Sequence, residues 1–395
     1  NIKTEKDDIS FEDADLNLIA KPQTFLTILA RQLNLISKNC QHVIIPDQSF
    51  KALGFKFIMK DIKFSEADLS NVVSDSFQNM MLFDLNPAIV KIVFQYEFQQ
   101  QIYPYITGSG NGFVDLFQQI KFSSSVAMSN SCPYHFKVSD FQSLVEIQHF
   151  HLELPDASPI IQAIINGLTS AFRDIFNQIL VEWVQNIGEL LNQNIELANS
   201  ITKTKNDFAT DSRYINYTLN NYFNFQTSGQ ICRYDPKTNF CSRWTVRKNI
   251  QQQPSKMFNM AVQFYISQNA IQSMLDHARY MNLFEDDIKI DKIVNTGIIV
   301  NINTVDFNAT VKCSLMAKTV RQNKENNLTQ PILQMKQLIS TTKDFNSVAY
   351  FEKMNAIFMT CSHNIDTLGF TSEEGQVINY VSPNWVIVAL NLLKE

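Results

Sequence analysis

Apolar residues recur every three or four positions in two long segments, Leu16–Cys40 and Ile160–Leu197. On each segment they fall on one side of a helix, at Phe25, Leu29 and Leu33 in the first and at Ile164, Leu168, Phe172, Ile175, Ile179 and Trp183 in the second. This spacing is typical of a helix with one buried face. We therefore predict two long amphipathic helices, the second of which starts after Pro155 and Pro159.

Between these segments the apolar period shortens to two, as in strands with one face in water. The alternation is visible around Phe57 and Met59, in Val90–Phe98 and in Leu144–Leu154. In the last run we expect one face to carry Leu144, Phe150, Leu152 and Leu154, and the other Val145, Ile147, His149 and His151. The glycines of Thr107–Gly112 interrupt the pattern, so we predict a hairpin turn there within an antiparallel meander.

A long amphipathic helix buries its apolar side only against another apolar surface, and the concave face of the meander supplies one. We therefore predict an α+β fold whose first module occupies residues 1–214. The polar and aromatic residues 215–253 predict a connecting sheet. The pattern then starts again in residues 254–395, where we expect a second, shorter module. Its predicted elements are a strand at Met257–Ile266, a helix at Ala270–Leu283 and strand alternation at Ile298–Met316.

The composition is that of a folded, apolar chain. Of 395 residues, 45% are hydrophobic, 30 are phenylalanine and 18% are charged, which is ample for a sizeable core. The formal net charge is −5, and residues 1–215 hold 16 Lys and Arg against 24 Asp and Glu. A nucleic-acid binder needs a concentrated basic field, so we exclude that class. No apolar run approaches the roughly 18 residues of a membrane-spanning helix, so we expect no transmembrane segment.

Three features favour a secreted or luminal protein. The chain begins with Asn rather than Met, as a mature protein does after loss of a signal peptide. Glycosylation sequons start at Asn216, Asn308 and Asn327. Among six cysteines, Cys232 and Cys241 flank a short polar loop, and we predict a disulfide between them.

The chain offers little for catalysis or metal binding. His149, His151 and Glu153 share one strand face and are a start for a metal site, but a solvated face explains them better. The sequence lacks the motifs of serine hydrolases, helical zinc proteases and dithiol redox proteins. We therefore predict no metal, no catalytic residues and no enzyme activity. A cluster of lysines follows the first predicted strand, at Lys51, Lys56, Lys60 and Lys63. The lysines could contact anionic lipid headgroups, but an ordinary solvated strand edge explains them better.

Several short strings follow one another in the order found in a known protein family. They are Ile45-Pro46-Asp47, Gly112–Leu116, Ile120–Ser123, Cys132 ahead of the Val145–Leu154 strand, Pro254–Phe258 and Ser267–Ile271. In this order they resemble the bactericidal/permeability-increasing protein family, which includes lipopolysaccharide-binding, cholesteryl-ester-transfer and phospholipid-transfer proteins. The resemblance runs through most of the chain.

The resemblance implies a boomerang of two elongated barrels, each a helix against a curved antiparallel sheet, joined by a central sheet. It also implies apolar pockets that hold a phospholipid or another acyl chain, with no other cofactor. The residues that we expect to contact lipid are Phe25, Leu29, Leu33, Phe57, Met59, Ile164, Leu168, Phe172, Ile175, Ile179, Trp183, Phe258, Met260, Ile271 and Leu275.

The sequence departs from the family's pattern in three places. Cys132 lacks its usual partner on the long helix, where no cysteine occurs near Val181. The second module is short, and Val377–Glu395 resembles the family's late helix with no closing strand after it. The first module is acidic where the antibacterial members are basic, which argues against endotoxin neutralisation.

We therefore predict a carrier that binds acyl-chain lipids and makes transient contact with membranes or lipid particles, with transfer and storage both left open as its task. An alternative of a different class is a scaffold subunit that uses the same fold in a protein assembly. A weaker alternative is host defence through lipopolysaccharide binding.

Overall fold

The structure is a computed structural model that describes residues 3–4, 14–22, 24, 45–77, 80–129, 135–197, 201–203, 208–219, 222–235, 237, 240–243, 253–321, 329–340, 342, 345–362 and 377–391. In these ranges the chain is α+β and dominated by strands. It divides into two compact units. Unit 2 comprises Leu26–Ala127 and Val138–Asn194, and unit 1 comprises Asn1–Phe25, Met128–Lys137 and Ile195–Glu395. The boomerang of two barrels stays a prediction.

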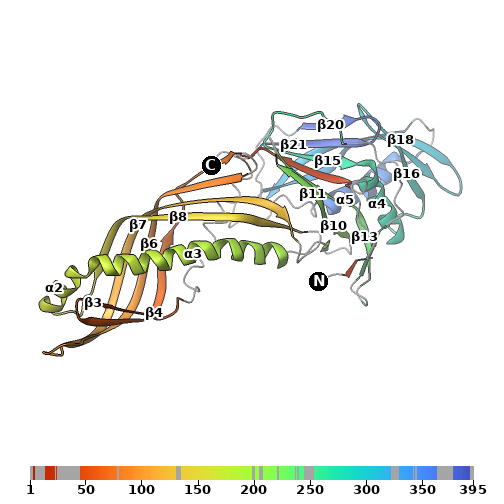
Figure 1. The fold of residues 1–395 in the computed structure, drawn as a ribbon. Helices are drawn as coiled ribbons and strands as arrows, with labels where there is room; N and C mark the ends of the chain where they lie inside the picture. The colour runs from red at the N-terminus through yellow and green to blue at the C-terminus, as the bar shows by residue number, and fades with distance from the viewer. Residues whose placement is uncertain are drawn as a thin grey trace. The chain divides into compact units, whose positions relative to one another are not determined.

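Unit 2 is a curled sheet with a long helix lying along its inner side (Figure 1). The sheet has the strand order β3-β4-β6-β7-β8, and β5 pairs with β6 beside this path. The strands are β3 (Gln48–Ala52), β4 (Phe55–Asp68), β5 (Val72–Phe77), β6 (Met80–Gln100), β7 (Thr107–Met128) and β8 (Phe136–Glu153). The pairs β3–β4, β4–β6 and β6–β7 are antiparallel, which confirms the predicted meander for these strands.

Apolar and polar residues alternate along the strands, so the sheet has one apolar and one polar side. We call the side that carries Val90, Ile92 and Phe94 the inner face, and the side in water the outer face. These three side chains of β6 are at most 3% exposed, whereas Gln95 and Glu97 on the other side are exposed. The same alternation runs along β4 and β7. Burial of this apolar face is the main force that holds the sheet against its helix.

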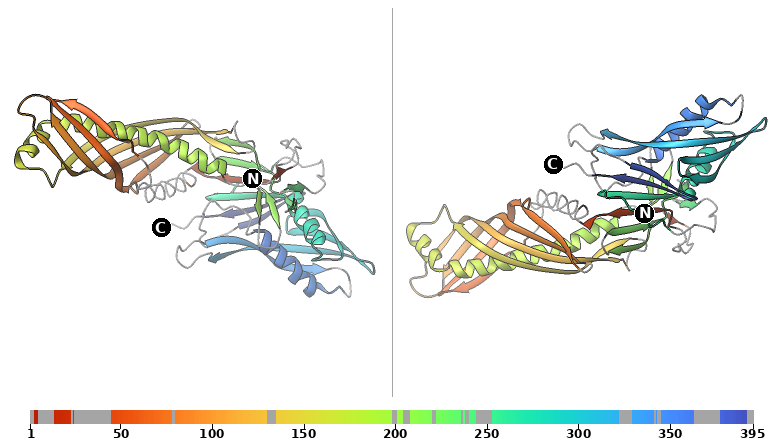
Figure 2. Two further views of the ribbon diagram at one scale, coloured as in Figure 1. Left: turned by 90° about the horizontal axis from the view of Figure 1, so that it is seen from below. Right: turned by 90° about the horizontal axis from the view of Figure 1, so that it is seen from above.

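Two helices are present where we predicted one. They are α2 (Pro159–Gly167) and α3 (Thr169–Leu197), and Leu168 between them has left the helical conformation. The longer helix, α3, lies along the inner face (Figure 1). The start is capped as the sequence suggests, because the Ser158 side chain accepts a hydrogen bond from the Ile161 amide and Pro159 opens the first turn. Both views in Figure 2 show α3 running along the curl of the sheet.

The first predicted helix is wrong at its start. Leu16–Ala20 is a strand, β2, that pairs with β12 and β15 on its two sides. A central strand of this kind is enclosed by neighbours, so apolar residues on it need not alternate strictly. The remainder of the predicted helix, with Phe25, Leu29 and Leu33, lies outside the described residues.

The predicted hairpin at Thr107–Gly112 is wrong. These residues open strand β7, and the turn lies just before them, at residues 101–106. In the β6–β7 register each glycine is opposite a large aromatic residue, with Gly108 opposite Phe98, Gly110 opposite Tyr96 and Gly112 opposite Phe94. A Cβ at Gly112 would lie 2.7 Å from Cζ of Phe94. The glycines therefore make room for the rings of the neighbouring strand.

The predicted faces of β8 are wrong in its first half. Val145 and Ile147 are buried and Leu144 is 62% exposed, whereas farther along Phe150 is the inward residue, 6.0 Å from the Phe176 ring. The side switches across Gln148 and His149, two successive exposed residues. One extra residue in a strand moves all later side chains to the other face, as in a β-bulge.

The described residues of unit 1 form three sheets and two helices. The largest sheet is ordered β11-β12-β2-β15-β21-β20, the second β16-β17-β18-β19 and the third β1-β14-β13-β10-β9. The elements are β1 (Lys3–Thr4), β9 (Ile201–Lys203), β10 (Ala209–Asp211), β11 (Tyr214–Leu219), β12 (Phe223–Thr227), β13 (Ile231–Asp235), β14 (Phe240–Arg243), β15 (Val262–Ser267), α4 (Gln268–Tyr280), β16 (Asp287–Val294), β17 (Gly297–Asn303), β18 (Asn308–Arg321), β19 (Thr329–Ser340), α5 (Ser347–Ser362), β20 (Val377–Val381) and β21 (Trp385–Leu390).

The predicted helix at Ala270–Leu283 is confirmed as α4, and the strand alternation of Ile298–Met316 is confirmed as β17 and β18. The predicted strand Met257–Ile266 starts only at Val262. The late helix predicted within Val377–Glu395 is wrong, because the described part of that segment forms the hairpin β20–β21.

The run Trp385–Leu390 is rich in β-branched residues and is buried at every position. Strand β21 therefore fits between β15 and β20, where both of its faces are covered and both of its edges are hydrogen-bonded. The segment that we expected to lack a closing strand thus supplies one.

Candidate functional site

The interior of unit 2, between the inner face and α3, is an apolar surface to which both the sheet and the helix contribute. Aromatic rings from the helix and the sheet meet there. The ring centroids of Phe172 and Phe57 are 5.4 Å apart, those of Trp183 and Phe64 4.8 Å, and those of Phe176 and Phe94 5.6 Å. The helix stripe and the alternating strands thus form one continuous apolar interior.

The structure brings together most of the lipid-contact residues predicted in the first module. Six of them are at most 5% exposed, namely Phe57, Met59, Leu168, Phe172, Ile179 and Trp183. Ile164 on α2 and Ile175 on α3 are half-buried. Their contact with lipid stays a prediction, because burial alone does not distinguish a ligand pocket from a packed core.

The residues predicted in the second module do not form one cluster with each other. Phe258 packs against the cluster of Ile19, Tyr265, Trp385 and Ile387 on the largest sheet of unit 1, and Met260 nearby is half-buried. Ile271 and Leu275 are buried on α4. These positions give unit 1 a core, and we base no pocket on them.

Sequence reasoning missed the polar groups on the inner face. Gln118 on β7 is completely buried, and neither its amide oxygen nor its amide nitrogen has a hydrogen-bond partner among the described residues. The Ser143 hydroxyl on β8 and the Trp183 indole nitrogen on α3 are also buried without a partner. The sequence offered one indication, because Gln118 alternates with Leu116 and Ile120 and therefore lies on the same side of the strand as these apolar residues.

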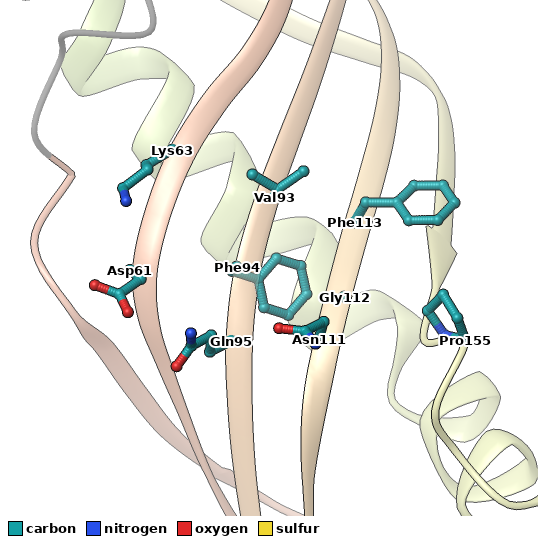
Figure 3. A pocket seen from close by; sticks show the side chains of 9 residues that line it. All are labelled: Asp61, Lys63, Val93, Phe94, Gln95, Asn111, Gly112, Phe113 and Pro155. Carbon is teal, nitrogen blue, oxygen red and sulfur yellow. The ribbon is translucent and has the colours of Figure 1, made fainter.

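A hollow of about 340 Å³ lies in the outer part of the sheet, at the bulge of β4 (Figure 3). Outer-face side chains and two inner-face residues line it together. The lining residues are Asp61, Lys63, Val93, Phe94, Gln95, Asn111, Gly112, Phe113 and Pro155. Asp61 has a positive φ of 49°, where the β4–β6 register shifts. An acid, a base and two amides thus line this hollow beside apolar side chains, and we base no acyl slot on it.

Two adjacent turns at one end of the sheet expose large apolar side chains. The backbone amide of Gln101 donates to the carbonyl of Gly54 over 2.8 Å and joins the turns. Each exposed side chain has 61–81% of its surface in water. We call this group the apolar tip, which comprises Leu53, Ile102, Tyr103 and Tyr105.

Two lysines flank the apolar tip. Lys51 and Lys56 lie directly opposite each other in the β3–β4 register, an arrangement that like charges destabilise. None of the ion pairs between described residues includes either lysine. Farther along β4, Lys60 pairs with Glu97 over 2.8 Å.

The histidine cluster lies on the solvated face, as the favoured interpretation had it. His151 and Glu153 are exposed and lie 3.6 Å apart, and His149 is exposed beside them. Among the described residues, no group of three or more His, Cys, Asp and Glu side chains is placed to hold a metal ion. No helix within the described ranges is both long enough and apolar enough to cross a membrane.

The residues predicted for modification lie in unit 1. Cys232 on β13 is buried, and Cys313 and Cys361 are free. Cys241 is on the adjacent strand β14, opposite Tyr234, and its side chain lies outside the described part of the chain. Asn308 is exposed at the start of β18, Asn216 is half-buried on β11, and Asn327 lies outside the described residues.

No protein-family model and no curated protein matches the sequence. A crystal structure of lipopolysaccharide binding protein aligns over 97% of this chain and 99% of that chain, with 11% identity and a TM-score of 0.52. Takeout 1 of Epiphyas postvittana aligns over 42% and 90%, with 14% identity and a TM-score of 0.31. P47 of Clostridium botulinum A2 aligns over 96% and 97%, with 8% identity and a TM-score of 0.23.

Only the first of these likenesses carries an argument, since the TM-scores of the other two are below 0.5. At 11% identity it concerns the fold alone. The chain shares the fold of lipopolysaccharide binding protein over nearly its whole length. The expected resemblance is confirmed at that level.

Proposed function

We propose that this chain binds acyl-chain lipids, phospholipids among them, in the interior of unit 2 between α3 and the inner face. The observation that carries the proposal is the continuous apolar surface formed by β4, β6, β7 and α3, on which side chains such as Val90, Ile92 and Val184 are completely buried. The fold shared with lipopolysaccharide binding protein supports it. We propose binding rather than catalysis.

The energetics of burial favour such a ligand. Each methylene removed from water contributes about 0.8 kcal/mol, so a sixteen-carbon chain gains on the order of 10 kcal/mol before the costs of ordering. That gain suffices for stable carriage without a specific headgroup contact. Affinity would then follow chain length.

Lipid extraction and native mass spectrometry of the purified protein test the proposal. We expect co-purifying acyl lipid and uptake of a fluorescent fatty acid. Val184→Phe adds a ring to the interior and should lower the stoichiometry of bound lipid. Val73→Phe makes the same change on exposed β5 and should leave it unchanged. Circular dichroism of both variants checks the fold.

Protein free of lipid that also takes up no fluorescent fatty acid would refute the proposal. If such protein were isolated in a stoichiometric complex with other chains, the scaffold alternative would replace it. Exchange of labelled phospholipid between donor and acceptor vesicles distinguishes transfer from storage, because storage leaves the exchange rate at its uncatalysed value.

We propose that unit 2 meets membranes or lipid particles through the apolar tip. Exposed tyrosines and aliphatic residues suit the boundary between headgroups and acyl chains, and the opposed Lys51 and Lys56 would be relieved by anionic headgroups. Tyr103→Ser combined with Tyr105→Ser should weaken binding to phosphatidylcholine–phosphatidylserine vesicles about tenfold in a co-sedimentation assay. Val305→Ser, at a fully exposed position of unit 1, is the matched control. Equal vesicle binding by the wild type, the double variant and the control would contradict the proposed role of the apolar tip.

We propose a secretory route for the protein, with glycosylation at the exposed Asn308 and a disulfide between Cys232 and Cys241 on adjacent strands. Peptide mapping of protein secreted from eukaryotic cells, with and without reduction, tests both modifications. A glycan-free Asn308 peptide rules out that site, and a Cys232 peptide linked to another cysteine rules out the pair.

A further inference from the structure

Helix α3 contacts both edge strands of the curled sheet of unit 2. At the edge strand β3, the Phe50 and Phe172 rings lie 5.0 Å apart. At the opposite edge strand, β8, the Phe150 and Phe176 rings lie 6.0 Å apart. The interior therefore has two boundaries along the helix. We call them the β8 seam, between α3 and β8, and the β3–β4 seam, between α3 and the strands β3 and β4.

Hydrogen bonds to the strand backbone hold the β8 seam. The Asn192 side chain accepts a hydrogen bond from the Val138 amide over 2.6 Å and donates one to the Val138 carbonyl over 2.9 Å. Toward the start of the helix, the Arg173 guanidinium donates to the Ile147 carbonyl. Helix α3 is thus tied to β8 at two separate points along the strand.

Aromatic rings meet across the β3–β4 seam. The ring centroids of Phe172 and Phe57 are 5.4 Å apart, and those of Trp183 and Phe64 are 4.8 Å apart. Phe172 and Trp183 are about three helical turns apart and so share one side of α3. Among the described residues, no hydrogen bond joins α3 to β3 or β4, and the buried indole nitrogen of Trp183 has no partner.

The two seams differ in what it costs to open them. Separation of α3 from β8 would remove the Asn192 partner of the Val138 amide and carbonyl, and Val138 is buried. Loss of such partners destabilises a protein, because buried backbone groups need hydrogen bonds. Separation at the β3–β4 seam parts aromatic rings. A hydrocarbon chain that passes between the rings replaces their contacts with similar ones.

We propose that acyl chains enter and leave the interior through the β3–β4 seam, where α3 swings away from β3 and β4 about its hydrogen bonds to β8. The break in the helix at Leu168 supports this motion, because α2 and α3 are separate helices there and need not move together. This inference rests on the proposed function and adds the route that the lipid takes.

A cross-link over each seam tests the route. Phe50→Cys with Phe172→Cys places thiols across the β3–β4 seam, and Phe150→Cys with Phe176→Cys places them across the β8 seam. Each pair replaces a half-buried ring on a strand and a buried ring on α3, so the two pairs are matched. Bismaleimidoethane joins the thiols, and peptide mass spectrometry verifies the link. Stopped-flow fluorescence measures the uptake and release of a dansyl-labelled fatty acid before and after linking.

We expect the link across the β3–β4 seam to slow uptake and release at least about tenfold and to leave the dissociation constant unchanged, because both rates fall together. The link across the β8 seam should change either rate by less than about twofold. Wild-type protein treated with the same reagent controls for the chain's own cysteines.

A second pair of variants tests the route without a cross-linker. Phe50→Ala trims a ring of the β3–β4 seam and should speed uptake about fivefold, whereas Phe150→Ala makes the same change at the β8 seam and should leave uptake within about twofold of wild type. Circular dichroism checks the fold of every variant. These single variants decide the matter if a cysteine pair does not fold.

Three outcomes would overturn the inference. If both links slow uptake equally, or neither does, the β3–β4 seam is not the route, and the proposed function survives alone. If only the link across the β8 seam slows uptake, or only Phe150→Ala speeds it, the lipid enters on the opposite side of α3. If wild-type protein carries no lipid and takes up no labelled fatty acid, the proposed function fails together with the inference.

Discussion

Among the described residues of unit 1, the buried carboxylate and guanidinium groups are those of Asp15, Asp211 and Arg213. Asp15 is completely buried and accepts hydrogen bonds from Ser267 and Gln230. Arg213 and Asp211 form a two-pronged ion pair with contacts of 2.7 and 2.8 Å, and both side chains are at most 4% exposed. Charges at such depth persist only when paired. The Asp15 contacts also join segments of unit 1 that are distant in the sequence.

Removing one partner of the buried ion pair should be costly. We expect Arg213→Ala to lower the free energy of unfolding by about 3–5 kcal/mol, because it leaves the Asp211 carboxylate buried without its partner. Urea denaturation followed by circular dichroism measures the change. Lys289→Ala breaks an ion pair of equal length, 2.7 Å, whose lysine is half exposed, and should cost less than about 1 kcal/mol. A similar loss in both variants would contradict the distinction.

A buried phenol and a buried thiol in unit 1 predict that the free energy of unfolding falls at alkaline pH. Burial raises the pKa of Tyr265 to about 12 and the pKa of the Cys313 thiol to about 12. In the unfolded chain these groups ionise near their ordinary values of about 10 and 8.5. Their folded pKa values are the higher ones, so the stabilisation they contribute is complete below about pH 8.5 and is lost as the pH rises toward 12.

The expected slope is up to about 1.4 kcal/mol per pH unit for each group across its own window. Urea unfolding at intervals between pH 8 and pH 11 measures it. Cys313→Ala should flatten the part of the curve that begins near pH 8.5, because the thiol no longer ionises in the unfolded state. An unchanged curve would show that other groups dominate.

Among the elements, β7 illustrates how two strands share space. Its glycines stand opposite Phe94, Tyr96 and Phe98, so the rings of β6 cover backbone that carries no side chain. A glycine run usually predicts a turn, since glycine weakens a strand. Here the gain in aromatic packing outweighs that weakness, and the turn falls at residues 101–106 instead.

Filling that space should destabilise the sheet. A Cβ at Gly112 would lie 2.5 Å from Cδ2 of Leu154 and 2.7 Å from Cζ of Phe94, so we expect Gly112→Val to cost about 1–3 kcal/mol. Gly167, the last residue of α2, has no heavy atom within 4 Å of an added Cβ, and Gly167→Ala should stabilise the protein by about 0.5–1 kcal/mol. Thermal unfolding measures both, and a stabilising Gly112→Val would contradict the packing argument.

For the whole molecule, charge bears on which lipids it approaches. The formal net charge is −5, and the acidic excess lies in residues 1–215. A fold shared with lipopolysaccharide binding protein does not bring the same ligand, because a negative molecule repels a strongly anionic one. This is the physical reason for ranking neutral acyl lipids ahead of endotoxin.

We accordingly expect no saturable binding of purified lipopolysaccharide at low ionic strength, where electrostatic attraction would be strongest. Isothermal titration calorimetry with lipopolysaccharide measures it, and hexadecanol serves as the positive control. A saturable isotherm that weakens with added salt would reinstate the host-defence alternative.

The sequence by itself determined most elements of unit 2 and much of its apolar interior. Strand and helix periods depend on local alternation, so Val90–Phe98 on β6 and Phe172–Trp183 on α3 were predictable from neighbouring residues alone. The same alternation of apolar and polar residues identified interior residues such as Phe57, Met59 and Ile179, which are buried. Local pattern is sufficient where one face of an element meets water and no extra residue shifts the phase, as happens in β8 across Gln148 and His149.

Only the tertiary structure decided the rest, because the deciding contacts come from residues far away in the chain. Leu16–Ala20 and Trp385–Leu390 are strands because both of their edges are paired with strands from elsewhere in the chain. The glycines of β7 are explained by the aromatic rings of β6. Whether the buried amide of Gln118 finds a hydrogen-bond partner depends on all the described residues around it, and none of them provides one. Burial on all sides erases the polar alternation that sequence reasoning requires, and pairing partners leave no local trace.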